Sequence, residues 1–151
     1  AYAFSTEGVV GYIMGRKNKK SFLLAVKNSM QLSFITAVII SLLFLIFYKH
    51  IINIITDVDV LRFISYKHFI WIIIIPPIAS FCYQLDGIFI GVSQTRDMRN
   101  AMIFAVASFI LISIYLTKYF GNHGLWFSLL LFIILRSITL NYFFKKILRR
   151  F

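Results

Sequence analysis

The chain has 151 residues, of which 60% are hydrophobic, and it carries a net charge of +11. A soluble domain of this size cannot bury so many apolar side chains, so the composition predicts an integral membrane protein in contact with lipid bilayer. The basic residues lie between long apolar segments and do not form one basic face, which excludes nucleic acid as a partner.

The apolar segments predict an all-α fold, a bundle of membrane-spanning helices without a soluble domain. Four segments have at least 18 residues, close to the roughly 20 that a helix needs to cross a bilayer. They lie near 29–48, 69–93, 101–118 and 123–144. A partial helix is expected near 1–15, and an interfacial helix is expected within 49–68. Because the chain opens with AYAFSTEG, as if inside a helix, we expect it to be a fragment.

The distribution of Lys and Arg predicts the orientation in the membrane. Eleven of the sixteen lie in alternate connections and the tail, at 16–27, 96–99 and 145–150. Cytoplasmic loops of membrane proteins carry such an excess, so the C-terminus is expected in the cytoplasm and the N-terminus outside. In a bacterium this places the chain in the inner, or plasma, membrane as a multi-pass protein.

Pro76 and Pro77 are the only prolines, and they interrupt the predicted span 69–93. A proline removes a backbone donor and disfavours helix at the preceding residue. Two interpretations stay open: a kink or break of the kind that borders transport sites, or a helix that simply begins at this pair.

Asp86 is an acid in an otherwise apolar helix. At a rise of roughly 1.5 Å per residue, it lies about 15 Å from Arg96 and about 15 Å from the proline pair. Since the hydrocarbon core of a bilayer is roughly 30 Å thick, this position is close to its middle. A carboxylate there is costly and is usually paired, protonated or part of an ion path. Tyr83 shares its helix face and Gln84 precedes it, so these residues are candidates for a cation or substrate site. The alternative is a structural ion pair.

Two further charges lie at mid-membrane depth. Arg136 is nine residues before Lys145, at about the depth of Asp86, so we predict an Asp86–Arg136 pair or a shared polar cavity. Glu7 is nine residues before Arg16 and is a candidate for the same polar site.

Small residues and turns complete the pattern. Gly8, Gly11 and Gly15 in the first helix, with the Gly87-x-x-x-Gly91 motif, predict close helix packing or a hinge. Residues 121–124 read Gly-Asn-His-Gly and predict a tight turn. The chain shows no metal-ligand spacing, no cofactor motif and no catalytic constellation, so an enzyme is not expected.

Three segments resemble the second half of MATE (multidrug and toxic compound extrusion) transporters, and most of all the DinF-like branch. They are STEGVVGYIMGR at 5–16, YQLDGIFIGVSQTRDMRNAM at 83–102 and GNHGLWFSLLLFIILRSITL at 121–140. The resemblance covers essentially the whole chain. It implies a partial second lobe of a twelve-helix transporter, from part of helix 8 to helix 12, without the first lobe and helix 7.

The resemblance implies export of organic cations or xenobiotics, driven by inward movement of H⁺ or Na⁺. In DinF-like members the proton-coupling aspartate lies in the first lobe, so no residue of this chain inherits that role. In the NorM-like branch a cation site includes an aspartate of helix 10. Asp86 is on the corresponding helix, about one turn away.

Five helices cannot enclose a cavity that two lobes form, so we expect no transport by this chain alone. Two alternatives stay open. The chain is a non-transporting remnant or a half that assembles with a separately encoded first lobe, or it belongs to a related flippase of lipid-linked oligosaccharides. The sequence does not identify the exported compound or the coupling ion.

Overall fold

The computed structural model describes residues 2–149, which form four helices and no strand. The helices are α1 (Tyr2–Gly15), α2 (Lys19–Ile55), α3 (Asp59–Gly91) and α4 (Thr95–Leu148). The predicted all-α fold is therefore confirmed. Ala1, at the start of the predicted first helix, and Arg150, in the basic tail, lie outside the described residues.

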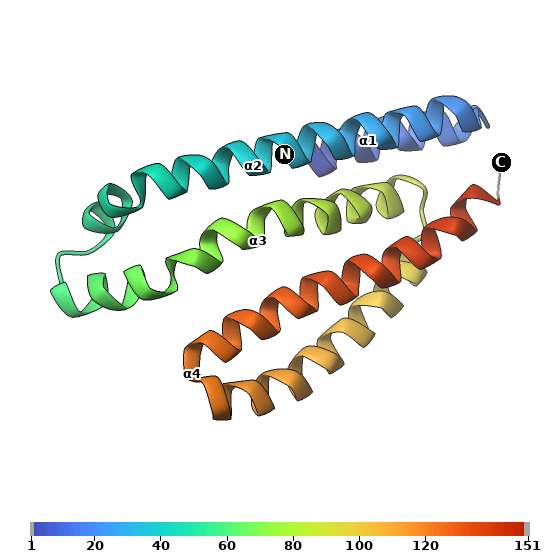
Figure 1. Cartoon of the computed structure of the whole chain (residues 1–151). Helices are drawn as coiled ribbons and strands as arrows, with labels where there is room; N and C mark the ends of the chain where they lie inside the picture. Colours follow the sequence, from blue (N-terminus) through green and yellow to red (C-terminus); the bar gives the residue numbers. More distant parts are fainter. Residues whose placement is uncertain (1, 150–151) are drawn as a thin grey trace.

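The helices α2, α3 and α4 are long and apolar enough to cross a membrane, whereas α1 has only 14 residues. A helix suits this solvent because it satisfies each backbone N–H and C=O within the segment, where hydrocarbon offers no partner. With 54 residues, α4 is more than twice as long as the roughly 20 that one crossing takes. It doubles back on itself, so that its two halves lie side by side (Figure 1).

The reversal of α4 occurs at Gly121, which has φ 56° and ψ −136°. Only glycine adopts this conformation without strain, because it lacks a Cβ. Gly124 then lies so close to the preceding pass that a Cβ there would collide with the backbone of Leu116. The predicted turn at 121–124 is present, and one predicted span falls in each pass: 101–118 in the first pass (95–120) and 123–144 in the second pass (122–148).

The connection between α2 and α3 is shorter than predicted. It comprises only residues 56–58, because α2 continues to Ile55 and α3 begins at Asp59. The prediction of a separate interfacial helix within 49–68 is therefore wrong. Arg62 holds this turn by donating from Nε to the Thr56 carbonyl oxygen at 2.8 Å, and its guanidinium also contacts Asp57 at 3.1 Å.

The two prolines lie inside α3, which is helical on both sides of them. The helix neither starts at Pro76 nor is broken there, so a helix start and a break are both excluded. Of the predicted alternatives, a kink within a continuous helix is the one compatible with α3. The missing N–H groups leave the carbonyls of Ile72 and Ile73 without their helical donors, which permits bending. Figure 1 shows the axis of α3 bending in the first half of the helix, before the prolines.

All connections gather at two ends of the bundle. The turns at 16–18 and 92–94 and the end of α4 lie together, as Figure 1 shows. We call this the basic end, because it carries the clusters of Lys and Arg. The turn at 56–58 and the reversal at Gly121 lie at the opposite end, which we call the far end.

Helix α3 contacts each of the other three helices and forms the centre of the bundle. The larger apolar core lies toward the basic end and takes residues from all four helices. Its buried members are Val10, Phe22, Val26, Leu85, Ile88, Phe89, Val92, Ala101, Leu140 and Ile147. A smaller core joins α3 to the second pass of α4 through Ala79, Cys82 and Ile133.

Glycines allow α1 to lie directly on α3. A Cβ added to Gly91 would lie 2.5 Å from the Glu7 carbonyl oxygen, and one added to Gly87 would collide with the backbone of Ala3. Gly11 packs in the same way on the backbone of Gly91, whereas Gly8 and Gly15 face open space. The glycines at 11, 87 and 91 therefore serve close packing.

Candidate functional site

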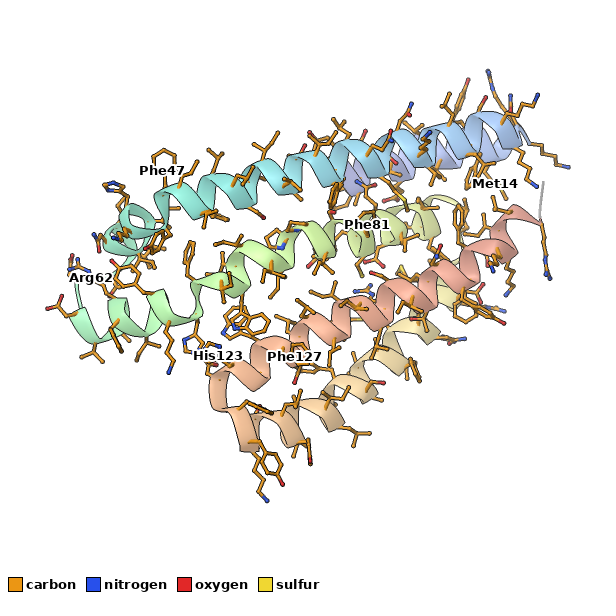
Figure 2. All side chains as sticks on the ribbon, in the orientation of Figure 1. Met14, Phe47, Arg62, Phe81, His123 and Phe127 are labelled. Atoms are coloured by element: carbon orange, nitrogen blue, oxygen red, sulfur yellow. The ribbon has the colours of Figure 1, made fainter. Side chains whose placement is uncertain are left out.

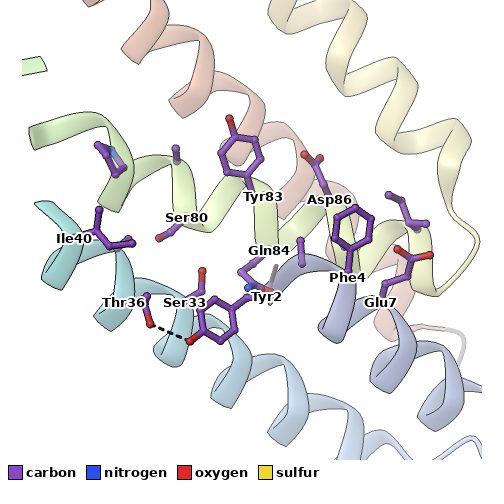
Figure 3. Close-up of a pocket in the computed structure, with 16 residues that line it drawn as sticks. Tyr2, Phe4, Glu7, Ser33, Thr36, Ile40, Ser80, Tyr83, Gln84 and Asp86 are labelled. Atoms are coloured by element: carbon purple, nitrogen blue, oxygen red, sulfur yellow. Dashed lines mark hydrogen bonds between the residues drawn. The ribbon is translucent and has the colours of Figure 1, made fainter. Parts of the chain in front are cut away.

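A cavity of about 750 Å³ lies between α1, α2 and α3. Its walls are mostly apolar, with aromatic rings from Tyr2, Phe4 and Tyr83 (Figure 3). The predicted site residues Glu7, Tyr83, Gln84 and Asp86 all line it, and so does Pro76. The bundle thus brings together residues that are up to 79 positions apart in the sequence, although their surroundings within the cavity differ.

Asp86 lies against the second pass of α4, where Arg136 Nη2 donates to its Oδ1 at 2.8 Å. The side chains are only 16% and 14% exposed, so the ion pair is largely shielded. Asp86 and Arg136, which the sequence placed at the same depth in the membrane, are therefore in direct contact. A carboxylate held in this way positions two helices and has less freedom to bind another cation.

Gln84 is nearly fully buried, at 1% exposure, and accepts a hydrogen bond at 2.8 Å from Thr6 Oγ1. This contact joins α3 to α1 beside the glycine contacts. The same hydroxyl lies 2.9 Å from the Tyr2 carbonyl oxygen of its own helix, so its single proton is shared between the two acceptors. The amide of Gln84 is therefore engaged in helix packing at the edge of the cavity.

Glu7 differs from Asp86 in having no ion-pair partner among residues 2–149. Its backbone is fixed, since its carbonyl lies against Gly91, while its side chain lines the cavity. Figure 3 shows the Phe4 ring between the carboxyl groups of Glu7 and Asp86. The cavity therefore presents one neutralised carboxylate and one that is available to a cation.

Tyr83 is 60% exposed and stands at the rim of the cavity, one turn before Asp86. Tyr2 lines the opposite wall, where Thr36 Oγ1 donates to its hydroxyl at 3.3 Å. Aromatic faces attract cations through the ring quadrupole. The described residues contain no group of three or more His, Cys, Asp or Glu side chains that would hold a metal ion.

Residues 1–117 match the model of the MatE family. The chain belongs to the MatE family. It is also 31% identical over 145 residues to DNA damage-inducible protein F of Escherichia coli (strain K12), a match that covers 96% of this chain and 31% of that relative. The chain therefore spans about a third of the length of the curated relative that it matches.

No solved structure matches this MatE chain significantly. The predicted resemblance to the MATE family and its DinF-like branch is confirmed by the family model and the relative. Together with the long apolar helices, the match shows a multi-pass membrane protein.

Among the polar contacts of this MatE chain that sequence reasoning missed are a hydrogen bond of Thr6 and an ion pair of Asp97. Thr6 carried no signal of its own, because a threonine in an apolar helix usually bonds to its own backbone. The second contact is an ion pair between Lys146 Nζ and the two carboxylate oxygens of Asp97, at 3.0 and 3.1 Å. A comparison of depths along the membrane normal could have predicted it. Asp97 follows the turn 92–94 and Lys146 lies near the end of α4, so both lie at the basic end. This pair closes the hairpin that α4 forms.

Proposed function

We propose that this chain is part of the second lobe of a MATE-type secondary transporter that exports small organic cations in exchange for H⁺ or Na⁺. The observation that carries the proposal is the unpaired carboxylate of Glu7 in an apolar cavity lined with aromatic rings. The family membership supports transport as the activity, and it favours an antiporter over an enzyme or an oligosaccharide flippase.

The chemistry of the cavity favours a cation with apolar substituents. Apolar walls bind the hydrophobic part of such a molecule, and the rings of Phe4 and Tyr83 add cation–π attraction. Glu7 supplies the negative charge, because the charge of Asp86 is compensated by Arg136. The same carboxylate is able to take up H⁺ or Na⁺ when the organic cation leaves, which is the exchange that an antiporter performs.

We further propose that the basic end faces the cytoplasm, with the C-terminus on that side of the inner membrane. The support is the excess of Lys and Arg at this end. These residues lie in and after the turn 16–18, at Arg96 and Arg99 just after the turn 92–94, and at the end of α4. A reporter fused after Phe151 is expected to be cytoplasmic. If the reporter proves to be outside, this orientation is wrong.

Transport requires a first lobe in this proposal. The cavity is bounded by only three helices, and Phe4 and Tyr83 at its rim are 79% and 60% exposed. Two rocking lobes close such a cavity alternately on either side of the membrane. We therefore expect no dye efflux from cells that express residues 1–151 alone, and efflux from this chain alone would contradict that part of the proposal.

The decisive experiment is dye efflux by a complete transporter that contains these helices, with Glu7→Gln compared with Glu7→Asp. Glu7→Gln keeps the size of the side chain but removes its charge, so we expect loss of cation export. Glu7→Asp keeps the charge, and we expect this variant to retain part of the cation export. Asp59→Asn is the control, because Asp59 is 94% exposed at the far end. Normal export by Glu7→Gln, at normal protein levels, would overturn the role of Glu7.

A further inference from the structure

Three aromatic side chains join α3 to the second pass of α4 at the far end. The rings of His68 and His123 are stacked, with centroids 4.3 Å apart and planes inclined by 28°. Trp71 Nε1 lies 3.1 Å from His123 Nδ1, one turn from His68 along α3. Figure 2 shows His123 where the two helices face each other. We call these three residues the histidine stack.

The hydrogen bonds of the histidine stack determine where the protons lie. An indole N–H is a donor only, so His123 Nδ1 must accept the bond from Trp71 and carries no proton. The Ile64 carbonyl is an acceptor only, so His68 donates to it from Nδ1 at 2.9 Å. These contacts require an uncharged imidazole at His123.

Among residues 2–149, no carboxylate lines the cavities beside the stack, where it could stabilise a charged ring. His68 lines a cavity of about 470 Å³. Helix α2 contributes only apolar side chains to its lining, the turn 56–58 contributes Thr56, and α4 contributes Asn122 and Trp126. His123 lines a separate cavity of about 310 Å³ with apolar side chains of both helices. The two histidines are the only titratable residues in these linings. The nearest charges along the two helices are Lys67 and Lys118, both cationic.

We propose that the histidine stack is a pH-sensitive latch that holds the far end of α3 against α4. A proton added to His123 Nδ1 turns an acceptor into a donor and abolishes the bond from Trp71. Two protonated rings at 4.3 Å would also repel each other, since no anion compensates them. The latch is closed when both rings are neutral and opens when they bind protons.

The direction of the pH effect follows from proton linkage. The open form binds more protons than the closed form, so a falling pH favours opening. Imidazole is the side chain whose charge most readily changes in the physiological pH range, so a histidine pair suits a switch of this kind. Gly121, at which α4 reverses, lies two residues before His123 and provides a hinge for the movement.

Tryptophan fluorescence tests the latch in the full chain reconstituted in lipid bilayers. The chain has two tryptophans, so Trp126→Phe leaves Trp71 as the only emitter. We expect one sigmoidal change of Trp71 emission between about pH 8 and pH 5. His123→Asn keeps an acceptor oxygen near the place of Nδ1 but does not titrate, so it should abolish the change. His50→Asn is the matched control, because His50 is exposed on α2 and outside the stack.

A distance measurement separates opening from a local change around the indole. Spin labels at Phe63 and Tyr119, which are 72% and 62% exposed, report on α3 and α4 at the far end. With Cys82→Ser as background, we expect the distance between the labels to lengthen at low pH in the parent and not in His123→Asn. An equal pH response in His123→Asn, or an unchanged distance in the parent, would overturn the latch.

Discussion

Asp86 and Arg136 meet between two apolar layers of the interface between α3 and α4. Cys82 and Ile133, one turn before each of them, belong to the smaller core. On the other side, the larger core contains Leu140, one turn after Arg136. The pair, with Arg136 Nη2 2.8 Å from Asp86 Oδ1, therefore fixes how far the two helices slide past each other. A slip by one turn would place both charges against apolar side chains.

Removing one member of this pair should destabilise the protein more than replacing both. Arg136→Met leaves the Asp86 carboxylate without a counterion, at a cost of about 3–5 kcal/mol. The double variant Asp86→Leu/Arg136→Met removes both charges, and we expect most of that cost to be recovered. Unfolding of the reconstituted chain by denaturant measures both. If the double variant is as unstable as the single one, the stability comes from packing and not from the ion pair.

Gly91→Ala should loosen the contact between α1 and α3. The added Cβ would lie 2.5 Å from the Glu7 carbonyl oxygen, and a backbone atom cannot move aside as a flexible side chain does. We expect a loss of about 1–3 kcal/mol in the free energy of unfolding. Gly8→Ala is the matched control on α1, because nothing lies within 4 Å of its added Cβ. Equal effects of the two substitutions would contradict close packing as the role of Gly91.

Gly121→Ala should strain the reversal of α4. Its φ of 56° with ψ of −136° is a conformation that residues with a Cβ adopt only under strain, at a cost of about 1–3 kcal/mol. Asn122→Ala, at the exposed neighbouring position, should have little effect. Thermal unfolding in detergent compares the two variants. A stability of Gly121→Ala equal to that of the parent would show that α4 has another way to turn.

Thr6→Val should weaken the buried contact between α1 and α3. Valine keeps the shape but leaves the Gln84 amide oxygen without its donor, which we expect to cost about 1–2 kcal/mol. Thr6→Ser keeps the hydroxyl and should retain most of the stability. Denaturant unfolding of both variants measures the difference. The prediction fails if serine and valine are equally destabilising, because the lost methyl packing would then explain both.

Much of this molecule was accessible from the sequence because a bilayer imposes simple rules. The long apolar runs predicted helices at 29–48 and 69–93. In the structure α2 extends beyond both predicted bounds, and α3 begins ten residues earlier, at Asp59, but ends at Gly91. The ends were underestimated because polar residues such as Asp59 remain helical outside the hydrocarbon, where hydropathy carries no signal. The effect of Pro76 was overestimated, since a helix surrounded by others tolerates the loss of a few hydrogen bonds.

The sequence predicted which residues form the candidate site, but not which contact each of them makes. Counting residues from the membrane boundary placed Asp86 and Arg136 at the same depth, because each helical residue advances by a fixed distance along the helix axis. Depth says nothing about rotation around a helix axis. The engagement of Gln84 with Thr6, and the freedom of Glu7, depend on which faces of α1 and α3 meet.

By itself, the sequence determined that this protein is a bundle of membrane helices, and where the apolar part of each long helix lies along the chain. It also determined which charges lie at mid-membrane depth, since these properties follow from local hydropathy and length. Only the tertiary structure decided which of those charges are neutralised. Arg136 contacts Asp86, while Glu7 is left to the cavity. Electrostatic pairing depends on contacts of a few ångströms between segments distant in sequence, and such contacts exist only once the helices have packed.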